Sequence, residues 1–296
     1  MPARKTGSWM LVGGRLHHLS VYERLFVAVF VAGAYCFMVE SLEESIRWNY
    51  LKVASLQSVL GLVFGALLVF RMNTAYARWW EGRTLWGTLV NSSRNLMIKV
   101  ARLARVSRDE KERVGQLVTG FSYALRNRLR GDTPVQRVPG FEHDPSRCSH
   151  APVDLAGRIY EHLAQWRRDG AIDDMGLRIL DTNANTLLDV CGGCERISRT
   201  PMVPSYVLYV RICIGLYLLM LPWALELDYM MVPITMIWAY FLCGMELIAE
   251  IIEDPFGTER DDLQLDVICD GIATSVREIL QGGEQGDVSV VPGDGH

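Results

Sequence analysis

Two runs without a charged residue constrain this chain more than any other feature of its sequence. Residues 53–70 and 229–245 are mainly apolar and contain no Asp, Glu, Lys or Arg. A helix that crosses a bilayer needs roughly 20 mainly apolar residues. Two further segments, 25–39 and 205–225, are also apolar, and the second holds a single charge, Arg211. The sequence therefore predicts an all-α membrane protein with four transmembrane helices, the first of them extended by its flanking residues.

The four segments form two pairs, which predicts two transmembrane hairpins. The connections within the pairs are short and acidic: residues 40–52 contain Glu43 and Glu44, and residues 226–228 read Glu-Leu-Asp. Basic residues gather on the other side: Arg4, Lys5, Arg15, Arg71, Arg78, Arg83, Arg94, Lys99, Arg102 and Arg105. Because basic loops stay in the cytoplasm, we expect a multi-pass cell-membrane protein with both termini cytoplasmic.

The region between the hairpins is predicted to be a large cytosolic helical domain. Apolar residues recur there at helical spacing over 86–104, 114–129, 155–166 and 177–197. A last helix has its apolar face between Leu265 and Ile279, and we expect Asp261 and Asp262 to cap its start. The predicted parts are an N-terminus (1–24), a first hairpin (25–70), a cytosolic domain (71–204), a second hairpin (205–250), a C-terminal helix (251–281) and a disordered tail (282–296).

Composition excludes several classes of protein. A net charge of −4 argues against a nucleic-acid-binding protein, which usually has a strong basic excess. The cysteines number seven, and Cys36, Cys213 and Cys243 lie in apolar runs, which argues against a secreted disulfide framework. The six histidines form no cluster, and no nucleophile–base pattern or phosphate loop is present in the sequence. We therefore expect neither an enzyme nor a cofactor.

Two groups of polar residues have competing interpretations. Cys191 and Cys194 form a lone Cys-x-x-Cys; a zinc site would need further ligands, for which His143 and His150 are candidates, whereas burial on an apolar helix face requires none. We favour burial and predict no metal site. Arg211 lies inside an apolar segment and is expected to pair with Glu246 or Glu250, although contact with a permeation path is the alternative.

One stripe of the second apolar segment is a candidate pore lining. Leu62, Ala66 and Phe70 lie at i, i+4 and i+8, beside the small-residue pair Gly61 and Gly65. Several copies packed around an axis would stack these side chains as apolar rings, which gate pores by dewetting. Ordinary helix packing explains the same spacing.

Motifs along most of the chain resemble the prokaryotic branch of the bestrophin family. They are Asn73-Thr74-Ala75-Tyr76-Ala77-Arg78-Trp79-Trp80, Leu85-Trp86-Gly87, Val90-Asn91-Ser92-Ser93-Arg94-Asn95-Leu96, Gly193-Cys194-Glu195-Arg196-Ile197 and Glu253-Asp254-Pro255-Phe256-Gly257-Thr258. They occur in the expected order, and the four apolar segments have the expected places.

The resemblance implies a homopentameric ion channel in the lipid bilayer, with a hydrophobic neck on the second membrane helix. The three neck positions fall on Leu62, Ala66 and Phe70, and Ala66 is smaller than the residue usual there. A second constriction is implied at Leu177 or Leu180. The prokaryotic branch favours monovalent cations, whereas animal members conduct chloride.

Other functions remain open at this point. The acidic run that binds calcium in animal members is interrupted here by Arg260, so we expect no calcium gating. A membrane-anchored scaffold or sensor would have the same helices without conductance. A membrane-bound metal or redox enzyme would use Cys191 and Cys194.

Overall fold

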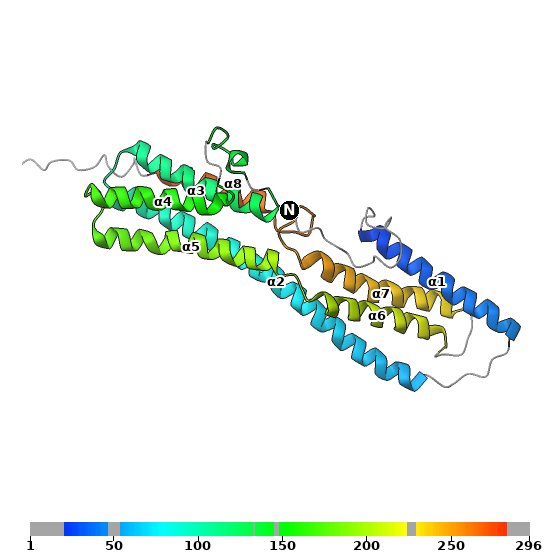
Figure 1. Cartoon of the computed structure of the whole chain (residues 1–296). Helices are drawn as coiled ribbons and strands as arrows, with labels where there is room; N and C mark the ends of the chain where they lie inside the picture. The colour runs from blue at the N-terminus through cyan, green and yellow to red at the C-terminus, as the bar shows by residue number, and fades with distance from the viewer. Residues whose placement is uncertain (1–20, 47–53, 133, 145–147, 224–228, 283–296) are drawn as a thin grey trace, which may run out of the picture. The chain divides into compact units, whose positions relative to one another are not determined.

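The chain is helical throughout the part that the structure describes. This computed structural model describes residues 21–46, 54–132, 134–144, 148–223 and 229–282, and no strand occurs in these ranges (Figure 1). The α-helices are α1 (Val21–Ile46), α2 (Ala54–Leu103), α3 (Arg108–Leu129), α4 (Ala151–Arg168), α5 (Asp174–Arg199), α6 (Pro204–Met220), α7 (Met231–Ile252) and α8 (Leu265–Gly282). Two short 3₁₀ helices, η2 (Val135–Arg137) and η3 (Leu221–Trp223), complete the described elements.

Two compact units divide the helices. Among the described residues, the membrane unit contains 21–79 and 201–254, and the extramembrane unit contains 80–200 and 255–282. Helix α2 contributes to both. The sequence predicted separate helices over 53–70 and 86–104, but α2 is continuous from Ala54 to Leu103 and has no proline to interrupt it. The predicted border between residues 70 and 71 therefore falls inside a helix, and the predicted domain boundaries stay predictions.

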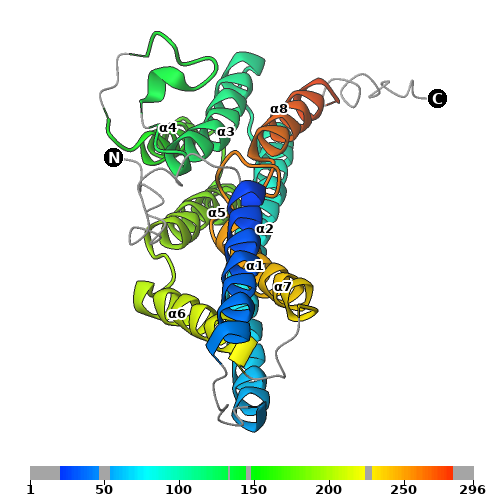
Figure 2. The same ribbon diagram turned by 90° about the vertical axis from the view of Figure 1, so that its right-hand side faces the viewer.

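The membrane unit contains the apolar helices that the sequence predicts. Four helical stretches are long and apolar enough to cross a bilayer, namely Tyr22–Leu42, Val59–Leu103, Pro204–Trp223 and Met231–Ile252. Helix α7 packs against α1, which lies beside it in Figure 2, and against α6, which lies beside it in Figure 1. Gly33 permits the close approach of α1 to α7, since a Cβ there would lie 2.8 Å from Cγ of Met236. The prediction of four transmembrane-type helices is confirmed.

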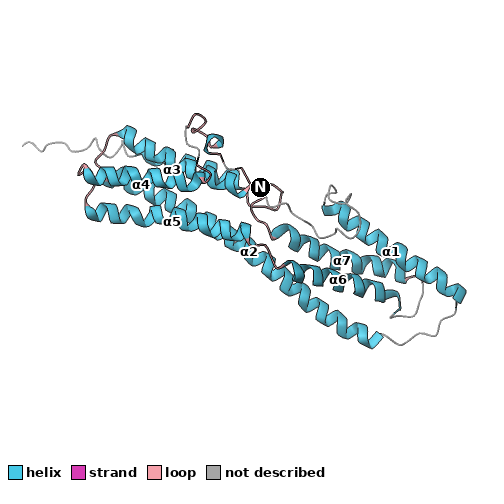
Figure 3. Cartoon of the chain, in the orientation of Figure 1, coloured by secondary structure: helices cyan, strands magenta, loops and turns pink. Residues whose placement is uncertain are grey.

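The extramembrane unit is a bundle with an ordinary aromatic and aliphatic core. Helix α3 packs on α4 and α8, and α4 packs on α5 (Figure 3). The largest fully buried side chains of this unit are Trp86, Leu89, Leu96, Met97, Phe121, Leu125, Leu155, Ile159, Leu163, Trp166 and Phe256. Most of them lie on the helical faces that the sequence periodicity indicates. Leu89 and Leu96 widen the buried face of α2, and Phe256 lies in the turn after α7.

The predicted cap of α8 is wrong. The helix begins at Leu265, so Asp261 and Asp262 precede it and Asp266 is the acidic residue of its first turn. Oδ2 of Asp262 accepts a hydrogen bond of 2.7 Å from the backbone N–H of Glu259. Asp262 therefore closes the turn before α8, where a Cβ on Gly257 would collide with its carboxylate.

Several predictions lie outside the described residues. These are the N-terminal segment up to residue 20, most of the connection before α2, the acidic connection at 226–228 and the tail after residue 282.

Candidate functional site

The apolar stripe of α2 faces away from the rest of the membrane unit. Leu62 is 79% exposed, Phe70 is 64% exposed, and Ala66 between them is also exposed. The three side chains share one side of the helix because residues four apart lie one above the other. Nothing in the described chain covers this stripe, which consists of apolar side chains only.

The opposite face of α2 packs on α6. Leu68 is buried against Val210 and Ile214, and the ring of Phe64 meets Tyr217 edge-on, with 5.4 Å between ring centroids. Residues 64 and 68 lie about half a turn from the stripe, given 3.6 residues per turn. Contacts with α6 therefore hold α2 at a rotation that leaves Leu62, Ala66 and Phe70 uncovered.

Gly61 and Gly65 differ in their surroundings. A Cβ on Gly61 would lie 3.4 Å from the hydroxyl oxygen of Tyr217, so this glycine faces α6. A Cβ on Gly65 would meet nothing within 4 Å. Of these two glycines, only Gly61 therefore allows close packing between helices of one chain.

Arg71, the residue after Phe70, is a buried anchor between α2 and α7. It is 1% exposed. Its Nε donates to Oε2 of Glu246 at 3.3 Å, and its Nη2 donates to Oε2 of Glu253 at 2.8 Å. Its Nη1 lies 2.9 Å from Sδ of Met202, whose backbone N–H donates to the other oxygen of Glu253 at 2.8 Å. Arg71 thus fixes the end of the stripe by charge-assisted bonds.

Arg211 joins the same network. Its Nε donates to Oε1 of Glu246 at 2.9 Å, and its Nη2 donates to Oε2 of Glu250 at 2.9 Å. Arg24 of α1 lies 3.8 Å from the other oxygen of Glu250. The predicted pairing of Arg211 is confirmed, with both glutamates as partners. A buried charge needs such compensation, because water is excluded from it.

Sequence reasoning placed Arg71 among the basic residues of the membrane–water boundary and missed its burial. A signal for it exists in α7. Glu246, Glu250 and Glu253 follow an uncharged run at i, i+4 and i+7, so they share one helix face. Three carboxylates on one face of a membrane helix require cations from neighbouring helices.

The two candidates for the second constriction differ in burial. Leu180 is fully buried in the extramembrane unit, whereas Leu177, one turn earlier on α5, is partly exposed. Leu177 therefore has the more accessible side chain of the two candidates.

The predicted burial of Cys191 and Cys194 is confirmed. Both are free thiols, and burial raises the pKa of Cys191 to about 12 and raises that of Cys194 as well. A thiol with such a pKa is almost wholly protonated at neutral pH and is a poor nucleophile. This protonation argues against redox chemistry at the pair.

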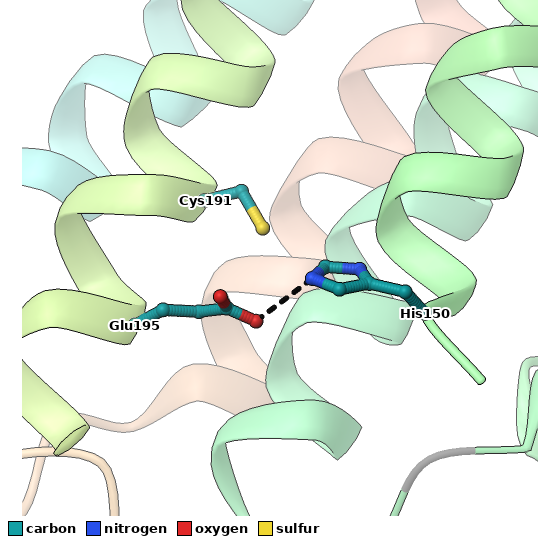
Figure 4. A group of neighbouring side chains, drawn as sticks. All are labelled: His150, Cys191 and Glu195. Carbon is teal, nitrogen blue, oxygen red and sulfur yellow. Dashed lines mark ion pairs between the residues drawn. The ribbon is translucent and has the colours of Figure 1, made fainter.

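Cys191 nevertheless has polar neighbours on α5 and at the start of α4. Figure 4 shows its sulfur pointing toward His150 and Glu195. Nε2 of His150 lies 2.9 Å from Oε1 of Glu195, and Nε of Arg128 donates to the same oxygen. Burial and the Arg128 charge lower the pKa of His150. Burial disfavours ionisation of Glu195, but the bond and charge of Arg128 outweigh it and lower the pKa of that carboxyl.

These features define a class of protein: an all-α membrane protein with an exposed apolar stripe on a long helix and a helical extramembrane unit. The chain belongs to the bestrophin family, since the family model described as "Bacterial/Fungal Bestrophin protein" matches residues 1–278.

Relatives and solved structures agree with this assignment. The chain is 34% identical over 241 residues to the "Voltage-dependent anion channel-forming protein YneE" of Escherichia coli (strain K12), covering 78% of this chain and 77% of that protein. It is 31% identical over 312 residues to the similarly named mll4386 of Mesorhizobium japonicum, covering 95% of both. A bestrophin homologue from Klebsiella pneumoniae, crystallised as a tryptophan-to-alanine variant, is 26% identical with a TM-score of 0.82, covering 89% of this chain and 99% of that one.

Proposed function

We propose that this chain forms an ion channel, assembled as a homopentamer around a pore that α2 lines. The observation that carries the proposal is the uncovered apolar stripe of α2, in which Leu62 and Phe70 are the most exposed members. Five copies around an axis would place these side chains in stacked rings. Membership of the bestrophin family and the channel-forming relatives support the same arrangement.

The rings would act as a hydrophobic neck. An ion passing an apolar constriction loses hydration, so ring width and wetting govern conduction. Ala66 has a short side chain, so we propose that the middle of the neck is wide and that Leu62 and Phe70 form the narrow rings. Leu177 is our candidate for the second constriction, on account of its partial exposure.

The buried network next to the neck would set its geometry. Arg71 follows Phe70 directly and binds Glu246 and Glu253 on the side of α2 opposite the stripe. Rotation of α2 about its axis would break both bonds and leave charges unpaired in a dry environment. We propose that Arg71 holds Phe70 toward the pore.

We propose small monovalent cations as the preferred ions, on the resemblance to the prokaryotic branch. The relatives' printed names specify anions instead. The neck has no charge of its own, so selectivity would come from charged groups or helix termini elsewhere along the path. A cytoplasmic location of both termini is part of the proposal and rests on the distribution of basic residues.

Planar-bilayer recording of the purified protein in a potassium chloride gradient tests this function. Phe70→Ala and Leu62→Ala are expected to change single-channel conductance, because each removes an apolar ring from the neck. Phe241→Ala is the matched control, since Phe241 on α7 is 60% exposed, close to the 64% of Phe70. It should leave the current unchanged.

The outcomes separate the candidate functions. The sign of the reversal potential distinguishes cation from anion preference. If wild type and both neck variants fold but pass no current, the channel proposal fails and the membrane-anchored scaffold or sensor takes its place. A current that Phe241→Ala alters as strongly as Phe70→Ala would refute the assignment of the neck.

A further inference from the structure

Three side chains of types that can bind metals, an imidazole, a thiol and a carboxylate, converge in the extramembrane unit. His150 is the N-cap residue of α4, and Cys191 and Glu195 lie four residues apart on one face of α5. The ligand atoms of the three residues all lie within 4.8 Å of one another, and the side chains point toward a common space (Figure 4). Cys191 is buried, and the other two are partly exposed.

We propose that His150, Cys191 and Glu195 form a binding site for a divalent transition metal of the zinc class. Imidazole nitrogen, thiolate sulfur and carboxylate oxygen are the donors that zinc takes in proteins. Metal–ligand bonds of roughly 2.0–2.3 Å in a tetrahedron hold donor atoms about 3.3–3.8 Å apart. Donors at the 4.8 Å limit would have to draw in by about 1–1.5 Å, whereas Nε2 of His150 and Oε1 of Glu195, 2.9 Å apart, would have to separate slightly. The fourth position would hold water.

Binding would convert the thiol to a thiolate. The S–H bond of Cys191 breaks, a sulfur–metal bond forms, and the proton leaves to solvent. The thiolate and the Glu195 carboxylate then balance the two charges of the cation. His150 would bind through its neutral ring, because only the neutral imidazole offers a lone pair to a metal.

Arg128 competes with the metal for Glu195. Its guanidinium donates to Oε1 of Glu195, the oxygen that also contacts His150, and Arg199 lies 3.5 Å from the other oxygen. Nη1 of Arg128 also donates to the carbonyl of Ser149 at 3.2 Å. Arg128 would keep this second partner when it releases the carboxylate. The Glu195 carboxylate would therefore bind either the metal or Arg128.

Cobalt titration of the purified full chain, carrying Cys148→Ser to remove the exposed thiol, tests the site. Cobalt replaces zinc and gives an intense near-ultraviolet band when bound to a thiolate. We expect this band, its bleaching by added zinc, and its loss in Cys191→Ser. Cys194→Ser is the matched control, because Cys194 is equally buried and lies outside the cluster. It should retain the band.

Three further variants test the other members of the site. His150→Gln and Glu195→Gln should each weaken cobalt binding by at least about tenfold. Arg128→Gln should strengthen binding, because it removes the competing cation. Circular dichroism identifies variants that fail to fold.

A measurement on unsubstituted protein covers the case in which variants misfold. Zinc should slow alkylation of Cys191 relative to Cys194, as resolved by mass spectrometry. The proposal is overturned if saturating cobalt gives no thiolate band, if the band persists in Cys191→Ser, or if zinc leaves the alkylation of Cys191 unchanged. None of these measurements depends on conductance, so their outcome does not test the channel function.

Discussion

The two units of this protein distribute apolar and charged side chains in opposite ways. The extramembrane unit buries Trp86, Phe121 and Trp166. The membrane unit exposes large apolar side chains such as Phe241 and buries the charges of Arg71 and Glu246.

The contrast teaches that the surroundings, and not the helices themselves, decide which side chains belong inside. In water, burial of apolar surface stabilises a helix bundle. In lipid that driving force between helices is absent, and polar contacts and close packing hold helices together. The most damaging substitutions should therefore be charge removals in the membrane unit and truncations of apolar side chains in the extramembrane unit.

The largest effect is expected from Arg71→Gln. Removal of the guanidinium takes away the cation bound to Glu253 and leaves Glu246 with Arg211 alone, which costs about 3–5 kcal/mol for a broken buried pair. Thermal unfolding in detergent should show a large fall in melting temperature. The double variant Arg71→Gln with Glu246→Gln should recover part of the loss. If Arg71→Gln alone is as stable as the wild type, buried charges do not stabilise the membrane unit.

A pair of identical substitutions compares the two units directly. Leu163→Ala removes a fully buried side chain from the extramembrane unit and should cost about 2–5 kcal/mol. Leu62→Ala removes an exposed one from α2 and should change stability by about 0.5 kcal/mol or less. Denaturant titrations of both variants give the comparison. Equal losses would mean that the stripe of α2 packs within the folded subunit.

A smaller effect is expected at Glu195, and it depends on pH. The folded protein lowers the pKa of this carboxyl below its usual 4.5, so the stabilisation is complete above about that pH and is lost as pH falls through the lower folded value. Glu195→Gln should therefore cost about 1–3 kcal/mol at pH 7. Melting temperatures of variant and wild type should approach each other as the pH is lowered below 4.5. If the two melting temperatures differ by the same amount at every pH, the carboxylate charge contributes nothing to stability.

The smallest effect is expected from the surface pair Arg108 and Glu112. Nε of Arg108 lies 2.7 Å from Oε1 of Glu112, with both side chains about half exposed. Exposed pairs of this spacing contribute only about 0.3–0.5 kcal/mol and are screened by salt. Replacing both by alanine should leave the denaturation midpoint nearly unchanged in high salt.

The sequence predicted the helices well because each depends on local periodicity. The uncharged runs and the apolar faces from Val114 to Ile197 identify helices without reference to any partner. The sequence does not predict the continuity of α2, because a charged run such as the one after Phe70 also marks the end of a membrane helix. Arginines tolerate a helix interior well, so charge alone does not end one.

The sites were harder to predict because they depend on long-range contacts. The partners of Arg211 could be named, since Glu246 and Glu250 are the carboxylates nearest to the apolar run. His150 is named as a candidate ligand beside Cys191, but the sequence cannot choose it over His143, and it does not predict the burial of Arg71, because both depend on how distant helices pack. The stripe of α2 was found from spacing, but whether a stripe is exposed or covered requires the fold.

The exposure of the α2 stripe has a consequence for how this protein varies. Leu62, Ala66 and Phe70 contribute little to the packing of the subunit, whose α2 contacts lie on the other side of the helix. Substitutions there escape the selection that preserves a core. In the pore that we propose, the three positions could therefore vary, by divergence or by design, with little loss of subunit stability.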